Sequence, residues 1–175
     1  MSDRIFDLAE ISCEEFESCR ILEEYLEAHG FQVEHGVGGM ETAFRAIYEQ
    51  GEGGPSFGLL AEYDALSMGH GCGHQMQGPA VIGAALCIRE LCGEKPYKIV
   101  VYGTPAEEAL GGKIIMQENG CFRDIDRCAD DAWSAGDLRG CENHGAGKFP
   151  GDISWKGSPC AMSPEKEEAG AGTGF

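Results

Sequence analysis

Residues 56–104, SFGLLAEYDALSMGHGCGHQMQGPAVIGAALCIRELCGEKPYKIVVYGT, contain the pattern that decides the fold. Segments 56–63 and 97–104 are apolar enough to form buried strands, and segment 80–92 between them is typical of a helix with small residues on one face. A strand, a helix and a second strand in this order predict parallel strands joined by a right-handed crossover. Sites in such sheets lie at the carboxyl ends of the strands.

The flanking segments extend this pattern. Residues 13–28 place apolar side chains at helical spacing, and His29-Gly30 fits the end of a helix. Segments 31–37 and 42–49 alternate apolar and polar residues and predict strands, and a later helix is expected to begin near Leu110. The sequence therefore predicts an α/β fold with a mostly parallel mixed sheet flanked by helices.

The composition excludes several classes of protein. The chain has 175 residues, and 13 Lys plus Arg against 30 Asp plus Glu give a formal net charge of −17. Such an acidic surface repels phosphate backbones and anionic lipids, so neither nucleic acid nor a membrane is expected as a partner. No segment is long and apolar enough to span a bilayer, and residues 1–16 lack the apolar core of a signal peptide. We therefore expect a cytoplasmic protein.

The loop GHGCGHQ, residues 69–75, follows the first buried strand and carries candidate metal ligands. Cys72 and His74 flank Gly73, and a glycine between two ligands lets the backbone fold tightly enough for both to face one ion. Buried cysteines and hydrogen-bonded histidines are also common core residues, so this motif alone leaves both interpretations open. His70 is expected to position the loop.

The pair Glu107-Glu108 follows the second buried strand. One carboxylate can bind an ion while its neighbour takes a proton from metal-bound water, although adjacent glutamates are also common at solvated helix starts. Gly111 and Gly112 are expected to let a ligand approach the backbone. Asp64, at the end of the first strand, can orient a ligand. Both segments follow predicted strands, which favours a single site.

Two blocks together resemble a known family. LLAEYDALSMGHGCGHQMQGPAVIGAAL, residues 59–86, and VYGTPAEEALGGKIIMQENGCFRDID, residues 101–126, are similar to the amidohydrolases of metallopeptidase family 20. This group includes the aminobenzoyl-glutamate hydrolases, the aminoacylases and the peptidase-domain-containing amidohydrolases. The resemblance implies the N-terminal part of a zinc-peptidase-like catalytic domain over residues 1–140 and the start of an α+β lid domain over residues 141–175.

The resemblance also implies roles for matching positions. Metal ligands would be Cys72, His74 and Glu108, with Glu107 as general base and Asp64 supporting the metal centre. The implied cofactor is zinc or manganese, with two ions in the complete site. The implied reaction is hydrolysis, by metal-activated water, of the amide bond of a small substrate, which would be an N-acyl amino acid, aminobenzoyl-glutamate or a dipeptide. The family forms homodimers through the lid, which residues 141–175 only begin.

The sequence departs from the family pattern in several places. Gln75 stands where many relatives have Asp or Asn. Two histidine ligands are missing: one belongs to an M-H-P block where residues 130–137 read DDAWSAGD, and the other lies beyond Phe175 in longer chains. These gaps keep open an inactive truncated metal-binding fragment or a pseudogene product. They also imply that the apolar strand at 97–103 forms an exposed sheet edge, which favours aggregation.

A third interpretation rests on the cysteines. Nine cysteines are present, including Cys121, Cys128, Cys141 and Cys160, which raises the possibility of a redox or zinc-ribbon protein. Their spacings are unequal and no CxxC pair occurs, so we expect most of them to be reduced core residues.

A shift of reading frame would account for the missing histidine. Codons for residues 129–133, read one base later, can encode Leu-Met-Met-His, and codons for residues 165–169, read two bases later, can encode Lys-Gly-Arg-Ser, both similar to family segments. We therefore predict that the nucleotide sequence of the gene, read in the shifted frame, gives a histidine near residue 132 and an open frame that continues. Codons that do not permit these alternative readings would contradict the hypothesis.

Overall fold

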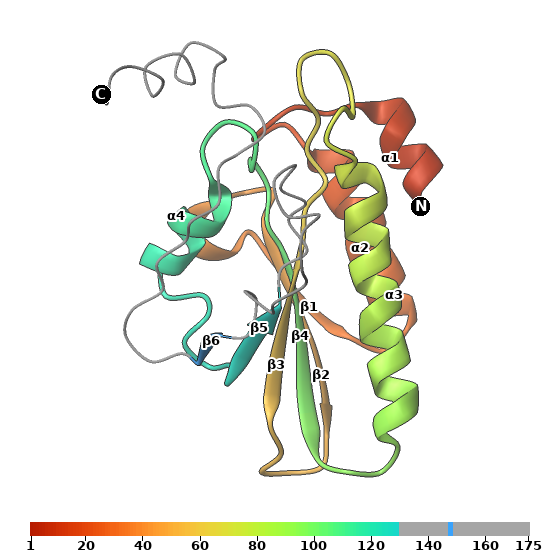
Figure 1. Cartoon of the computed structure of the whole chain (residues 1–175), viewed down its shortest axis with the longest axis vertical. Coiled ribbons are helices and arrows are strands. Elements are labelled where there is room, and N and C mark those ends of the chain that lie inside the picture. Colours follow the sequence, from red (N-terminus) through yellow and green to blue (C-terminus); the bar gives the residue numbers. More distant parts are fainter. Residues whose placement is uncertain (130–146, 149–175) are drawn as a thin grey trace, which may run out of the picture.

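The computed structural model describes residues 1–129 and 147–148 (Figure 1). Its helices are α1 (Ser2–Leu8), α2 (Phe16–Ala28), α3 (His74–Cys92) and α4 (Gly112–Glu118), with a short 3₁₀ turn at Val37–Gly39. Its strands are β1 (Gln32–His35), β2 (Phe44–Gln50), β3 (Ser56–Ala61), β4 (Tyr97–Gly103), β5 (Arg127–Ala129) and β6 (Gly147–Lys148).

The strands form one mixed sheet in the order β1-β2-β4-β3-β5-β6. Parallel pairing joins β4 to β3 and β3 to β5, whereas β1, β2 and β6 pair antiparallel to their neighbours. The predicted mixed sheet flanked by helices is confirmed. Its parallel part is the centre, where β3, α3 and β4 form the crossover unit expected from residues 56–104.

The strand expected at an exposed edge lies inside the sheet. In β4, residues 97–103 pair with β2 on one side and with β3 on the other. Ile99, Val100 and Val101 are fully buried. The edge prediction was therefore wrong, because β2 folds back antiparallel onto β4 and covers the edge that a purely parallel arrangement would have exposed.

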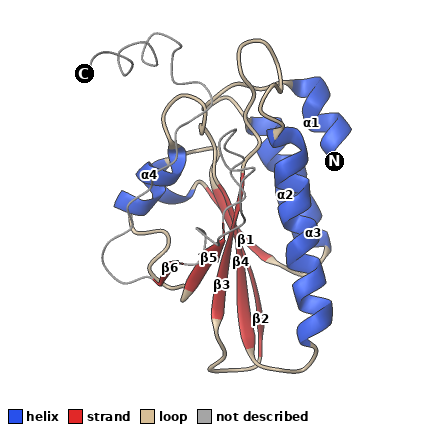
Figure 2. Cartoon of the chain, in the orientation of Figure 1, coloured by secondary structure: helices blue, strands red, loops and turns tan. Residues whose placement is uncertain are grey.

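Side chains of β4 alternate between two apolar clusters, one on each face of the sheet. Ile99 and Val101 pack with residues of α1, α2 and α3, whereas Val100 and Tyr102 pack with Met116 of α4. Figure 2 shows α2 and α3 on one side of the sheet and α4 on the other. This two-sided burial explains the nearly continuous apolar run that identified the strand.

Helix α3 packs closely against the end of β3 at Gly78, which precedes the segment 80–92 predicted as the helix. A Cβ added to Gly78 would lie 2.7 Å from the carbonyl oxygen of Glu62. Gln77 joins the two elements, because its Oε1 accepts the Glu62 N–H at 2.7 Å and its Nε2 donates to the Leu60 carbonyl at 3.1 Å. These contacts fix the start of α3 against the strand end.

The structure also differs from the predicted element boundaries. Helix α1 was not predicted, and α3 begins at His74, well before residue 80. The proposed lid segment 141–175 and the reading-frame hypothesis fall outside the described residues, apart from residues 147–148. No helix in the described part of the chain is long and apolar enough to cross a membrane.

Two glycines of α3 are expected to respond oppositely to alanine. Gly83→Ala adds a methyl group where no atom lies within 4 Å, so it should raise the free energy of unfolding by roughly 0.5–1 kcal/mol. Gly78→Ala drives its methyl group into the Glu62 carbonyl and should lower that free energy by about 1–3 kcal/mol. Urea unfolding of both variants measures this, and equal effects at the two positions would contradict the close packing of α3.

Candidate metal centre

The candidate site lies where β3, β4 and the start of α3 meet. Beyond the end of β3 come Glu62 and Asp64, and beyond the end of β4 come Glu107 and Glu108. Because β3 and β4 run parallel, their carboxyl ends reach the same edge of the sheet. His74, the first residue of α3, joins them there.

His74 is buried, and both nitrogens of its ring face carboxylates. Its Nδ1 lies 2.8 Å from Asp64 Oδ1, and its Nε2 lies 3.0 Å from Glu62 Oε2 and 3.7 Å from Glu108 Oε1. Burial lowers the pKa of His74, but the hydrogen bond to Asp64 and the surrounding carboxylate charges outweigh burial and raise it to about 9. In this arrangement the imidazolium compensates part of the negative charge around it.

The Asp64 carboxylate connects three segments of the chain. Besides His74, it accepts the Glu108 N–H at 3.0 Å and the Ser12 hydroxyl at 2.9 Å, both on Oδ2. Burial raises the pKa of Asp64, but the hydrogen bonds from His74 and Glu108 hold it below its usual range. The predicted orienting role of Asp64 is consistent with these contacts, which hold both the ring of His74 and the backbone of the glutamate pair.

Glu107 and Glu108 lie on a turn that orients their side chains differently. The Glu108 side chain is 5% exposed and the Glu107 side chain 20%. Both carboxylate oxygens of Glu108 are buried without a hydrogen-bond partner among the described residues. A buried carboxylate that lacks such partners is costly, and the ring of His74 lies 3.7 Å from Glu108 Oε1.

Two charged residues of the site were not predicted. Lys113, near the start of α4, donates to Glu62 Oε1, and its Nζ also lies 3.9 Å from Glu107 Oε2. Both Lys113 and Glu62 are buried. The sequence carried one signal for Glu62: it precedes Asp64 by two residues at a strand end, a spacing that places both side chains on one face of an extended segment.

The site has an excess of negative charge. Four carboxylates, from Glu62, Asp64, Glu107 and Glu108, face two cations, Lys113 and protonated His74. The formal sum is −4 + 2 = −2 for these groups. Buried charge without compensation is unfavourable, so the site suits a divalent cation, which would replace the proton on His74 Nε2.

Only part of the predicted ligand set is assembled. His74 and Glu108 are neighbours, but Cys72, half-buried in the preceding loop, does not complete a group of three donor atoms that all lie within 4.8 Å of one another. Gly73, between Cys72 and His74, has φ 83°, the left-handed conformation that favours glycine. The adjacent Gln75 is buried, and its Oε1 has no hydrogen-bond partner in the described part of the chain.

His70 lies outside this group. Its Nε2 lies 2.9 Å from the Ile5 carbonyl oxygen, and its ring stacks on Phe6 of α1 with centroids 6.1 Å apart. This contact agrees with the expectation that His70 positions the loop. Helix α1 therefore contributes to the site indirectly, because it contacts His70 in the loop of residues 69–75.

Gly112 serves a different purpose from the one predicted. A Cβ at this position would lie 1.9 Å from the Pro105 carbonyl oxygen. The glycine therefore permits a close approach between α4 and the turn that carries the glutamate pair, and the expected approach of a ligand is not needed to explain it. Gly111 adopts φ 63° at the start of α4, which any other residue would adopt with strain.

Glu15 holds the turn that carries Glu107 and Glu108. Its fully buried carboxylate accepts the Ala106 N–H at 2.8 Å on Oε1 and the Thr42 hydroxyl at 3.0 Å on Oε2. Ala106 itself has φ 58°, a left-handed conformation that is uncommon outside glycine. Sequence reasoning missed Glu15, which no motif distinguishes from the adjacent Glu14.

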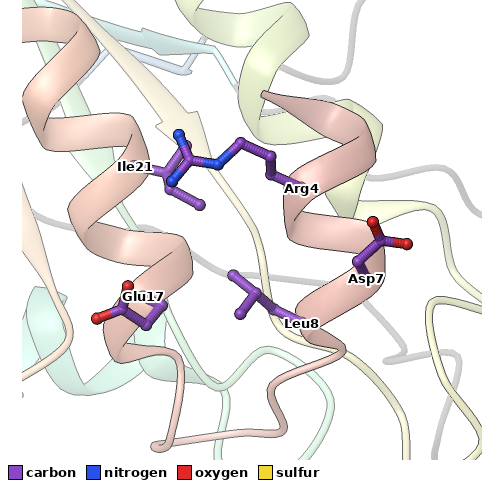
Figure 3. A pocket seen from close by; sticks show the side chains of 5 residues that line it. All are labelled: Arg4, Asp7, Leu8, Glu17 and Ile21. Atoms are coloured by element: carbon purple, nitrogen blue, oxygen red, sulfur yellow. The ribbon is translucent and has the colours of Figure 1, made fainter.

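A separate cavity of about 220 Å³ lies between α1 and α2 (Figure 3). It is lined by Arg4, Asp7, Leu8, Glu17 and Ile21. None of these residues belongs to the candidate site, so the cavity adds nothing to it.

Known proteins resemble this chain in sequence and in fold. One component of the p-aminobenzoyl-glutamate hydrolase of Escherichia coli is 35% identical over 146 residues, which are 72% of this chain and 30% of that protein. A Bacillus subtilis protein described as a dinuclear metal-binding peptidase from the M20 family superposes with a TM-score of 0.63 at 22% identity, over 74% of this chain and 42% of that one. The chain is related to metallopeptidase family 20.

Further relatives support this family 20 relationship. The human Xaa-Arg dipeptidase is 38% identical over 143 residues, covering 72% of this chain and 33% of its own length. The aminobenzoyl-glutamate utilization protein of Klebsiella pneumoniae shares the fold with a TM-score of 0.65 at 19% identity, over 77% of this chain and 43% of that chain. No protein-family model matches the chain. It spans about a third of the length of the curated relatives it matches.

We predict that Glu15 stabilises this turn through the hydrogen bonds that its carboxylate accepts. Glu15→Ala leaves the Ala106 N–H and the Thr42 hydroxyl without their acceptor and should lower the free energy of unfolding by about 1–3 kcal/mol. Burial raises the pKa of Glu15 above its usual value, and the hydrogen bonds that its carboxylate accepts offset only part of that rise. Glu15→Gln keeps one acceptor oxygen and carries no charge, so it should cost less stability than Glu15→Ala.

Urea unfolding at neutral pH measures both effects. The exposed neighbour Glu14 provides the control, since Glu14→Ala should have little effect. A Glu15→Gln variant as unstable as Glu15→Ala would contradict this prediction, because the retained acceptor oxygen would then contribute nothing.

Proposed function

We propose that this chain carries part of the active site of a metal-dependent amidohydrolase or peptidase. The substrate would be a small molecule with an amide bond next to an amino-acid carboxylate, such as an N-acyl amino acid, aminobenzoyl-glutamate or a dipeptide. The names of the relatives support the class, because they include an aminobenzoyl-glutamate hydrolase and dipeptidases. The acidic site also supports this class, as does its placement at the ends of two parallel strands in a chain related to family 20.

One observation carries this proposal. Glu108 holds a buried carboxylate that accepts no hydrogen bond from the described residues, and it lies 3.7 Å from His74 Nε2. Carboxylate oxygen and imidazole nitrogen are ordinary ligands of zinc and manganese. A divalent ion would satisfy the Glu108 oxygens and reduce the negative charge of the site.

The other residues would prepare His74 and Glu108 to hold that ion. Asp64 accepts the His74 Nδ1–H, which leaves Nε2 as the ligand atom, the arrangement found where a carboxylate orients a metal-binding histidine. Asp64 also fixes the Glu108 backbone. Cys72 would supply a thiolate from the loop two residues before His74.

Glu107 is placed to move protons. When bound, the ion would supply a Lewis acid that lowers the pKa of a coordinated water. Glu107, less buried than its neighbour, would accept a proton from the attacking water on its carboxylate and return it to the leaving amine. Lys113 lies between Glu107 and Glu62, where it keeps the two carboxylates from repelling each other.

The family pattern requires more than these residues. Its two further histidine ligands have no matching position in the part of the chain that the structure describes. The lid and the homodimer that it forms belong to the same proposal, with residues 1–140 as the catalytic part and 141–175 as the start of the lid. Zinc or manganese, as one or two ions, would be the cofactor.

We predict that substitution of Glu108 weakens metal binding, whereas substitution of Glu107 reduces the rate of hydrolysis. Glu108→Gln removes a ligand charge and should weaken zinc or manganese binding, measured by equilibrium dialysis of the purified chain. Glu107→Gln should leave metal binding intact and reduce hydrolysis of aminobenzoyl-glutamate by about 10²–10⁴-fold, since it removes the general base. Glu118→Gln, at the exposed end of α4, is the control and should alter neither.

The outcomes distinguish an enzyme from a fragment that only binds metal. Metal binding that depends on Glu108, without any turnover, would identify a metal-binding fragment. Metal binding unaffected by Glu108→Gln would contradict the proposed site.

A further inference from the structure

A second set of metal-donor groups lies away from the strand ends that carry the candidate site. Cys19 and Glu23 lie one turn apart on α2, and His35 is the last residue of β1. The thiol sulfur, a carboxylate oxygen and a ring nitrogen of these residues all lie within 4.8 Å of one another. Among the described residues this is the sole group of three or more such donors.

The spacing of α2 and the end of β1 produce this arrangement. Residues four apart on a helix lie on the same face, so Cys19 and Glu23 present their side chains together. Glu23 Oε1 lies 2.7 Å from His35 Nδ1, which brings the strand end against that face. The group therefore joins a helix to an edge strand.

The three donors range from fully buried to exposed, which gives an ion a route from solvent to the thiol. Cys19 is fully buried, the Glu23 side chain is 13% exposed and the His35 side chain is 55% exposed. An ion could enter from the His35 side and reach the thiol behind it. The Cys19 thiol also interacts with the side chains of Tyr63 and Glu23, so its surroundings are defined before any ion arrives.

We propose that Cys19, Glu23 and His35 form a zinc site that links α2 to β1, distinct from the candidate metal centre. Thiolate, carboxylate and imidazole are the usual ligands of zinc, and three protein ligands leave a fourth position for water. Ideal tetrahedral coordination places donor atoms about 3.5 Å apart. The three donors lie within 4.8 Å of one another, so binding would draw them closer together.

Charge supports zinc at this position. The Cys19 thiol is fully buried, and a cysteine must lose its proton to bind a metal. On binding, the sulfur–hydrogen bond breaks, its proton passes to solvent and a sulfur–zinc bond forms. Thiolate, carboxylate and Zn²⁺ then sum to −1 − 1 + 2 = 0, so the partly buried group carries no net charge.

Cobalt(II) provides a spectroscopic test, because a thiolate bound to cobalt gives an absorption band that oxygen and nitrogen ligands do not. The full chain carrying Cys72→Ser, which removes the thiol of the candidate metal centre, is titrated with cobalt(II). We expect a thiolate–cobalt band that saturates at one equivalent. The band should be lost when Cys19→Ala, Glu23→Gln or His35→Ala is added.

Glu24→Gln is the matched control, since Glu24 is adjacent on α2 but binds Arg20 instead. It should retain the band. No band in the Cys72→Ser background, or a band that survives Glu23→Gln and His35→Ala, would overturn the proposal. Retention of the band in Glu108→Gln would show that the site is independent of the proposed hydrolase centre.

A thermal melt gives a second readout that does not need cobalt. Zinc should raise the melting temperature of the Cys72→Ser chain, because an ion that binds only the folded state stabilises it. The increase should be smaller in His35→Ala, whose exposed side chain can be removed without disturbing the core, and unchanged in Glu24→Gln. An equal increase in all three chains would contradict zinc binding at this group.

Discussion

The carboxylate of Asp64 is the constraint on which the site depends. Its two oxygens hold the ring of His74 at the start of α3, the backbone of Glu108 after β4 and the hydroxyl of Ser12. These groups are far apart in the sequence and share no secondary structure element. Without one buried acceptor for all of them, the parallel strands would bring two loops to the same edge of the sheet but would not fix their relative positions.

That buried carboxylate belongs to a group whose charges do not balance. Lys113 and protonated His74 compensate only part of the charge of the surrounding acids, and most of these side chains are buried. A protein that lacked any use for the site could replace several of these acids by apolar residues at little cost. The excess of negative charge around Glu108 is therefore the physical reason for regarding this region as a cation site and not as an ordinary core.

The sequence was most informative where one residue type had few alternative explanations. Apolar runs predicted β3 and β4, and His74 and Glu108, each following a predicted strand, proved to be neighbours. Strand direction was harder, because the alternating pattern of residues 42–49 does not indicate that β2 folds back beside β4. Glu15, Glu62 and Lys113 were missed because charged residues are usually exposed, and only the folded chain shows that these three are buried. The position of Cys72 depends on a loop whose conformation no periodicity specifies.

The left-handed conformation of Ala106 has a consequence for how this turn can vary. A non-glycine residue in that region carries a conformational penalty on the order of 1–2 kcal/mol, and glycine would remove it. Glycine would also let the backbone adopt many other conformations, so the relief of strain would come with a less uniform direction for the two glutamates that follow. Local stability and the accuracy of side-chain placement therefore oppose each other at this position, and alanine favours accuracy.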